Sequence, residues 1–292
     1  MTDARDSRLG VALVAAGAVA WSTAGYFTRL IPVGLWPLLV WRNVFGGLFI
    51  ACYLGATSPR AALASFRALR ASGWIGAVVN GLSMICFLAA LRHTSVANVA
   101  VIYATAPFVA AALAWLLFRD PASRRTLAAG VVALVGVAVT VGATPRLHGL
   151  TGDALALLMT LGLATFTVIS RRRRDISMVS AAAASAWIGA LVALPFAPTL
   201  AVSAHDLGLI ALFGVTSFGL GLVLYTLGSR HVHAARTALV STLELPLAPL
   251  WVWLAFGERP GAATVGGGSL VIAAVLANVL TGERRAPAFE PV

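Results

Sequence analysis

The chain has 292 residues, of which 60% are hydrophobic and only 11% are charged, and its mean hydropathy is +0.91. Ordinary soluble domains carry about 25% charged residues, so this composition excludes a soluble globular protein. Disorder is excluded because it requires low hydrophobicity. The two cysteines, Cys52 and Cys86, lie inside apolar runs and do not build a disulfide framework. An all-α polytopic membrane protein is the class that remains.

The net charge of +11 and the isoelectric point of about 11.4 come entirely from arginine. Nucleic-acid binders place their basic residues on one soluble face, whereas these arginines stand in short clusters between apolar runs. We therefore expect no nucleic-acid partner. Arginines at the ends of apolar runs instead set the orientation of membrane helices.

Ten apolar runs are long enough to cross a bilayer, which takes about 20 residues per helix. In chain order they are residues 9–30, 34–54, 72–91, 95–118, 124–142, 151–170, 179–197, 207–228, 234–256 and 262–281. The runs are continuous rather than alternating, which favours helices over a membrane β-barrel. The longest connection, residues 55–71, has the composition of a short surface helix. Residues 18–20 resemble a signal-peptidase site, but the apolar run continues to Phe27 and favours a span.

The arginines are distributed unevenly between the two ends of these spans. With the N-terminus taken as cytoplasmic, sixteen arginines fall in inner segments, four fall at outer ends, and Arg42 lies within a span. Cytoplasmic segments carry the excess of positive charge. The distribution predicts a multi-pass protein of a bacterial inner membrane with both termini in the cytoplasm.

The two halves of the chain resemble each other. A shift of 138 residues places Gly81-Leu82 on Gly219-Leu220, Arg92-His93 on Arg230-His231, Trp115 on Trp253, Phe118 on Phe256 and Asp120 on Glu258, and a shift of 142 places Thr23 on Thr165 and Arg29 on Arg171. Each half holds five spans, so the second half crosses the membrane in the opposite sense. We expect two inverted five-helix repeats, residues 1–148 and 149–292. Such repeats recur in secondary transporters, which bind substrate near the midplane between them.

Several short motifs carry a family resemblance. They are Ala20–Thr23, Trp41–Asn43, Leu91–Asn98 leading into Pro107, Trp115–Phe118, Leu243–Pro246 and Phe256–Glu258. With the ten spans, they make the chain similar to the EamA-type drug/metabolite transporter superfamily, and within it most similar to the YddG-type exporters of aromatic amino acids. The first half departs from the family in Phe118-Arg119-Asp120, where the family usually has Gly-Glu. The resemblance implies export of amino acids or related amphipathic metabolites.

Two charged residues lie deep within the predicted spans, where a charge costs about 2.5 kcal/mol or more. Glu244 is ten residues into its helix, about 15 Å deep, and Arg42 is about eight residues, roughly 12 Å, from the outer end of its helix. Their similar depths allow contact. Three interpretations stay open: the two residues bind a zwitterionic substrate, Glu244 relays a proton, or the pair is a salt bridge that only holds helices together.

Polar and aromatic side chains inside the spans share helix faces at i, i+3, i+4 and i+7 spacing. We expect these faces to point into the bundle, where a residue either lines a cavity or bonds to another helix. Together with Arg42 and Glu244, the candidate substrate-binding residues are Trp21, Tyr26, Asn80, Asn98, Tyr103, Ser217 and Tyr225. Pro107, Pro246 and Pro249 interrupt the fourth and ninth spans, either as hinges or as packing kinks. Glycines 266–268 predict close helix approach.

Signs of catalysis are few. The sequence has no phosphate-binding loop, no nucleophile elbow and no His or Cys pair at metal spacing within a span, so we expect neither a cofactor nor an enzyme. The predicted function is a secondary transporter of small zwitterionic molecules, with membrane lipid as its other contact. An integral-membrane enzyme acting on a lipid carrier is the alternative, and it needs clustered acidic or His residues at one membrane face. Because both halves lie in one chain, a monomer contains a complete pathway.

The predicted orientation has a direct test. Tags fused to either terminus should be protected from impermeant reagents in intact cells, and a cysteine introduced at Val33 should be labelled, because the arginine distribution places Val33 outside. Labelling of either terminus from outside would overturn the orientation.

Overall fold

The computed structural model describes residues 2–57, 59–67, 69–119, 123–142, 149–172, 178–232 and 234–283, and every regular element in these ranges is a helix. The helices are α1 (Thr2–Ser22), α2 (Ala24–Leu30), α3 (Leu35–Thr57), α4 (Pro59–Arg67), α5 (Ala71–His93), α6 (Val96–Tyr103), α7 (Ala106–Phe118), α8 (Arg124–Gly142), α9 (Gly149–Arg172), α10 (Met178–Ala193), the 3₁₀ turn η1 (Leu194–Phe196), α11 (Ala204–Phe213), the π-helical η2 (Gly214–Leu220), α12 (Gly221–Ser229), α13 (Ala234–Ser241), α14 (Glu244–Phe256) and α15 (Ala262–Glu283).

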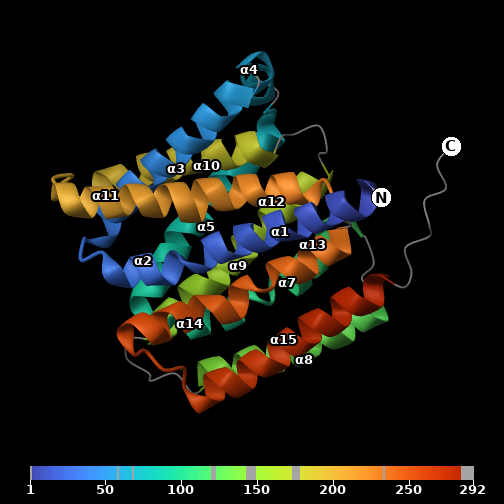
Figure 1. Cartoon of the computed structure of the whole chain (residues 1–292). Coiled ribbons are helices and arrows are strands. Elements are labelled where there is room, and N and C mark those ends of the chain that lie inside the picture. Colours follow the sequence, from blue (N-terminus) through green and yellow to red (C-terminus); the bar gives the residue numbers. More distant parts are fainter. Residues whose placement is uncertain are drawn as a thin grey trace.

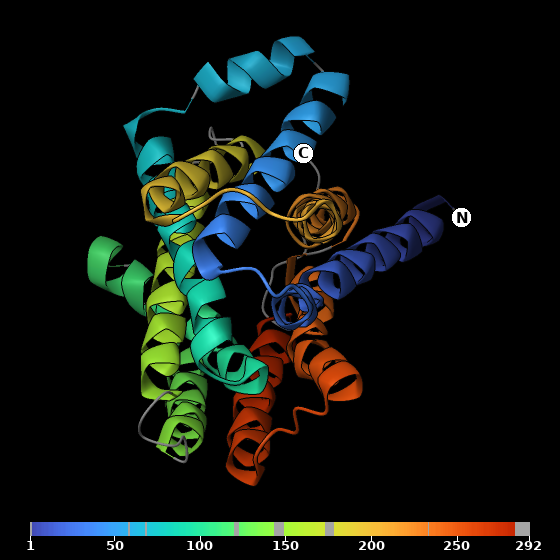
Figure 2. The same ribbon diagram turned by 90° about the vertical axis from the view of Figure 1, so that its left-hand side faces the viewer.

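The ten predicted spans are confirmed. Ten helical segments are long and apolar enough to cross a membrane, and their ends lie within three residues of those expected from hydropathy. The outward side chains of these segments are apolar; Leu116, Leu134 and Leu254 are 65%, 63% and 68% exposed. A face of this kind suits lipid rather than water. The short helix expected in the longest connection is α4, which both views place at the edge of the bundle (Figures 1 and 2).

The two repeats pack against each other in reciprocal pairs. The third span of the first repeat, α5, packs along α9 of the second, and α12 of the second packs along α1 of the first. The fifth spans, α8 and α15, lie side by side at one edge (Figure 1). A Cβ built on Gly136 would lie 2.5 Å from the Gly267 carbonyl oxygen, so this close approach of backbones requires glycine. Gly268 is also tightly packed, whereas Gly266 has no such neighbour.

The same register relates the helices of the two repeats. A shift of 138 residues carries α6 onto α13 and α7 onto α14 without any offset. Both α7 and α14 end in a left-handed residue, which is Arg119 at φ 54° in the first repeat and Gly257 at φ 70° in the second. Arg119 belongs to the motif that departs from the family pattern. Asp120 lies outside the described residues, as do residues 143–148 at the end of the expected first repeat.

This difference between the repeats predicts that exchanging the residue types at positions 119 and 257 has opposite effects on stability. The left-handed conformation costs a non-glycine residue about 1–2 kcal/mol, and a glycine at this position removes that strain. The glycine also gives the unfolded chain more conformational entropy, which offsets about 0.5–1 kcal/mol of the stabilisation. Arg119→Gly should therefore raise the melting temperature in detergent by about 1–4 °C. The matched exchange Gly257→Arg should lower it, since a Cβ at Gly257 meets no atom within 4 Å and only backbone strain is added. A lower melting temperature for Arg119→Gly would contradict this account.

Candidate functional site

Three spans of the bundle are broken, and each break contains a threonine. The breaks lie at Thr23 between α1 and α2, at residues 104–105 between α6 and α7, and at residues 242–243 between α13 and α14. In each case the threonine hydroxyl donates to the carbonyl three residues earlier, at 2.6, 2.7 and 2.6 Å. These bonds replace part of the interrupted backbone ladder. Pro107 and Pro246 follow the second and third breaks, whereas Pro249, which was also expected to interrupt the ninth span, lies inside α14 without a break.

The broken spans meet around one cavity. Its walls come from the residues on either side of the first break, from α5 and α6, and from the start of α14, and are formed by Trp21, Ser22, Ala24, Gly25, Phe87, Leu91, Val96, Val99, Ala100, Tyr103, Glu244, Leu245 and Ala248. Both repeats therefore contribute to it. The space left between these side chains is that of about one or two water molecules. A larger ligand enters only when the walls move apart.

Glu244 is the charged residue of this cavity. It is the first residue of α14, where the positive end of the helix dipole favours a carboxylate. Within the described ranges, no hydrogen bond or ion pair involves its carboxylate. Tyr103 lines the same cavity. The carboxylate is therefore placed to bind a cationic group that enters the cavity.

Contacts with α12 and α14 fix the position of Trp21 and Ser22, two residues of the cavity wall at the end of α1. The ring of Trp21 lies 5.1 Å from that of Tyr225 on α12, at an interplanar angle of 41°. Gly221 leaves room for Trp21, because a Cβ there would lie 2.6 Å from the indole. Next to it, the buried Ser22 hydroxyl accepts a 2.8 Å hydrogen bond from Trp251 Nε1 on α14. These contacts fix the position of the first break relative to α12 and α14.

Arg42 lies on α3 and is not among the residues that line the cavity. Its side chain is 2% exposed, and its guanidinium carbon lies 4.7 Å from the ring centre of Phe213 and 5.3 Å from that of Phe218. Its Nη1 donates to Asn43 Oδ1 at 3.4 Å, and its Nε has no hydrogen-bond partner. In the described part of the chain no ion pair joins it to Glu244. The hypothesis of a structural salt bridge between these two residues is therefore wrong for this conformation: Arg42 faces α11 and η2, while Glu244 faces α1, α5 and α6.

The other predicted residues lie at contacts between helices. Tyr26 packs on Phe256, with ring centres 5.5 Å apart. Asn80 donates to Ser185 Oγ on α10 at 2.8 Å. Asn98 accepts from Thr264 on α15 at 2.8 Å, and Ser217 is buried in η2. The structure thus brings Trp21, Tyr103, Tyr225 and Glu244 together and places Tyr26, Arg42, Asn80, Asn98 and Ser217 elsewhere in the bundle.

Several residues of the site were not singled out from the sequence. Most of the missed cavity residues are aliphatic, and hydropathy does not separate them from other apolar residues in a span. Leu91 and Val96 belong to the family motif Leu91–Asn98, but they were not among the candidate substrate-binding residues. Asp153 was also missed: it is 1% exposed, and its Oδ1 accepts from the Thr94 hydroxyl at 2.9 Å. Its position near the end of a run made it look like an ordinary terminal residue. Within the described ranges, no three His, Cys, Asp or Glu side chains gather as metal ligands do.

The arrangement agrees with comparisons to known proteins. The model of the EamA-like transporter family matches residues 8–142 and again residues 150–280. The chain belongs to the EamA-like transporter family. It is also similar to a solved structure described only as "Crystal structure of protein", with a TM-score of 0.66, 17% identity and coverage of 94% of this chain and 98% of that chain. That likeness shows the fold. No curated protein matches the chain.

Membership of this family makes the chain a multi-pass membrane transporter of small molecules, and the double match agrees with two repeats. The cavity lies where both repeats contribute walls, as the inverted-repeat architecture requires of a transport site.

The separation of Arg42 from Glu244 can be tested by a double-mutant cycle. Residues without contact or shared partners have effects on stability that add within about 0.5 kcal/mol. Arg42→Met and Glu244→Gln should therefore be additive when unfolding is followed in detergent. The matched control is Arg29→Gln with Glu258→Gln, which removes an ion pair of 2.9 Å and should be non-additive. A coupling above about 1 kcal/mol between Arg42 and Glu244 would show that they pair.

Proposed function

We propose that this transporter exports amino acids with aromatic or large neutral side chains, or related amphipathic metabolites, across a bacterial inner membrane. It works by alternating access of the cavity between the two repeats, with both termini in the cytoplasm. The observation that carries the proposal is the composition of the cavity: one carboxylate, that of Glu244, among aromatic and aliphatic side chains.

Each part of the cavity suits one part of such a substrate. The ammonium group of an amino acid would bind the Glu244 carboxylate and lie against the ring faces of Trp21 and Tyr103, which attract cations. The substrate side chain would pack on Phe87 and its aliphatic neighbours. Apolar walls discriminate one methylene by only about 1–3 kcal/mol, so the site should accept several large side chains.

The second charge of the substrate requires a separate partner. Arg42 remains the proposed residue for the substrate carboxylate, because it is the deep arginine of the spans and its buried Nε lacks a partner. In this conformation Phe213 and Phe218 cover it. Reaching it therefore requires α11 and η2 to move relative to α3, which belongs to the opening of the transport path. One deep group of each sign suits a zwitterion better than a strongly anionic or a doubly cationic solute.

Counterflow in proteoliposomes tests the substrate. Radiolabelled Phe, Tyr, Trp, Met and Leu should exchange, and Glu244→Gln should reduce this exchange about 10–100-fold, as expected for loss of a charged contact of about 1.5–3 kcal/mol. Trp21→Ala should weaken exchange and the protection of overexpressing cells against toxic aromatic amino-acid analogues.

Two matched variants serve as controls. Asp206→Asn removes a carboxylate at the exposed start of α11, and Trp74→Ala removes a tryptophan that is 48% exposed on α5. Both should leave exchange unchanged. Exchange of an anionic or permanently cationic solute, with none of any large neutral amino acid, would refute the substrate class. Product formation from lipids by the same proteoliposomes would favour the enzyme alternative.

A further inference from the structure

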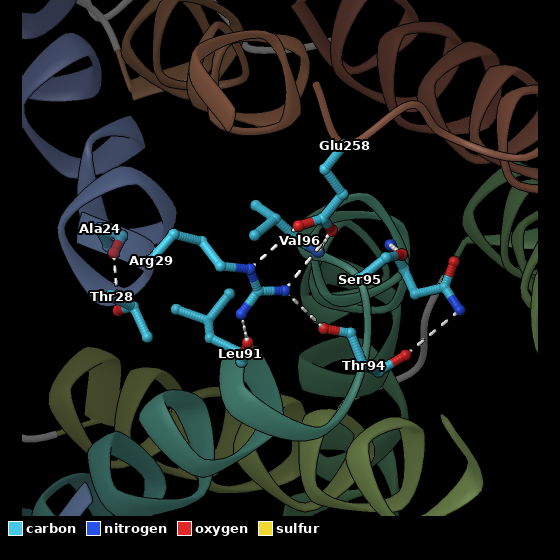
Figure 3. A network of polar contacts seen from close by, with 9 residues as sticks. Ala24, Thr28, Arg29, Leu91, Thr94, Ser95, Val96 and Glu258 are labelled. Atoms are coloured by element: carbon cyan, nitrogen blue, oxygen red, sulfur yellow. Dashed lines mark hydrogen bonds and ion pairs between the residues drawn. The ribbon is translucent and has the colours of Figure 1, made fainter. Parts of the chain in front are cut away.

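One ion pair joins the two repeats at the end of the bundle that carries α2. Arg29, in the last turn of α2, donates from Nε to Glu258 Oε2 at 2.9 Å and from Nη2 to Glu258 Oε1 at 3.4 Å. Glu258 lies in the connection between α14 and α15. Figure 3 shows the guanidinium between this carboxylate and the turn that joins α5 to α6. Arg29 comes from the first repeat and Glu258 from the second.

The same two side chains also hold the turn between α5 and α6. Arg29 Nη1 donates to the Leu91 carbonyl, and Nη2 donates to the Thr94 carbonyl at 3.1 Å. Glu258 Oε1 accepts from the Val96 backbone N–H, at the start of α6, at 3.2 Å. Three chain segments, namely α2, the α5–α6 turn and the α14–α15 connection, therefore converge on one charge pair. We call these five residues, Arg29, Leu91, Thr94, Val96 and Glu258, the Arg29–Glu258 network.

The turn held by this network is anchored on its other side. The Thr94 hydroxyl donates to Asp153 Oδ1 on α9 at 2.9 Å. Gly152 fits closely under it, since a Cβ there would lie 2.7 Å from the Thr94 nitrogen. The turn therefore has a fixed contact with α9 and an ionic contact with α2 and the α14–α15 connection. The contact with α9 involves close backbone packing at Gly152, whereas the ionic contact joins two partly exposed side chains, which can separate without disturbing that packing.

The network lies directly over the cavity. Leu91 and Val96, whose backbones bind Arg29 and Glu258, also contribute side chains to the cavity wall. A Cβ built on Gly25, another wall residue, would lie 2.7 Å from Val96 Cγ1. Figure 2, which looks onto this end of the bundle, shows α2 end-on near its centre. Separation of the α14–α15 connection from α2 and the α5–α6 turn would thus part the cavity walls on this side.

The exposure of the pair fits a contact that breaks and reforms. The side chains of Arg29 and Glu258 are 24% and 28% exposed, so water reaches both charges when they separate. A fully buried pair would leave uncompensated charges on opening. A fully exposed pair would hold the segments only weakly.

We propose that the Arg29–Glu258 network is the gate that closes the substrate cavity on the Arg29 side of the membrane. Opening toward that side requires the ion pair and the Val96 N–H bond to Glu258 to break together. The inference rests on the proposed function only in taking this cavity as the transport site. It does not depend on which substrate is carried.

The test measures access to the cavity. In a background with Cys52→Ala and Cys86→Ala, the wall residue Ala248→Cys is reacted with a membrane-impermeant maleimide in right-side-out and inverted vesicles. Arg29→Gln and Glu258→Gln should each increase the labelling rate from the Arg29 side about tenfold or more. The double variant should be labelled no faster than the faster single variant, because both changes open the same gate. The same experiment reports the orientation, because the variants accelerate labelling only in the vesicles that expose the Arg29 side to the reagent.

The control is Arg259→Gln, which removes an exposed charge next to Glu258 and should leave the rate unchanged. Equal rates in Arg29→Gln and the parent, or equal acceleration by Arg259→Gln, would overturn the proposal. If Arg29→Gln does not fold, as judged by melting temperature and size exclusion, Arg29→Lys replaces it. Lysine keeps the positive charge but lacks the forked geometry of the guanidinium, so this variant should be labelled at an intermediate rate. Labelling of Arg29→Lys at the parental rate would count against the gate. Since labelling needs no substrate, failure of amino-acid counterflow with an intact labelling response would remove the substrate class and leave the gate.

Discussion

A helix inside a bilayer can break only where the protein replaces the backbone hydrogen bonds that it loses, because lipid offers no donors or acceptors. This chain breaks three spans, and at each break a threonine hydroxyl donates to the carbonyl three residues earlier. The residues next to the three breaks also line one cavity. The site lies at these breaks: Trp21, Tyr103 and Glu244 stand next to the interruptions of the first, fourth and ninth spans and line the same cavity.

The two repeats share a register but differ in the residues that lie next to the breaks and line the cavity. Shifting the first repeat by 138 residues places Ala106 on Glu244, so the second repeat alone supplies a carboxylate at the start of its half-helix. The first span is broken at Thr23, whereas the matching Thr165 bonds to the carbonyl four residues back, at Leu161, and leaves α9 continuous. A scaffold of two related repeats thus carries an asymmetric cavity.

The charges in and next to the spans are stabilised in three different ways. Arg42 is covered by two aromatic rings, Glu244 lies at a helix N-terminus beside a cavity, and Arg29 and Glu258 pair near one end with access to water. The costs of these arrangements differ: a cation between rings keeps part of its solvation through the ring quadrupoles, while a carboxylate at a helix start gains from the dipole.

Hydropathy alone determined the ten spans, because a helix in lipid must be apolar over its whole length and that property is local in the chain. The sequence also indicated, from Pro107 and Pro246, that the fourth and ninth spans are interrupted, and it indicated the surface helix at 59–67 and the carboxylate of Glu244 within a span. The repeat was also visible in the sequence, since both halves preserve one register.

Only the tertiary structure decided which polar residues meet. Arg42 and Glu244 have similar depths, but depth leaves the rotation of a helix about its axis undetermined, and packing of α3 on α11 turned Arg42 away from the cavity. Asn80 and Asn98 point into the bundle as periodicity indicated, yet their partners, Ser185 and Thr264, come from helices that no local pattern connects to them. The pairing of Arg29 with Glu258 spans 229 residues of chain; it exists because the two repeats fold against each other, and no property of either segment by itself contains it.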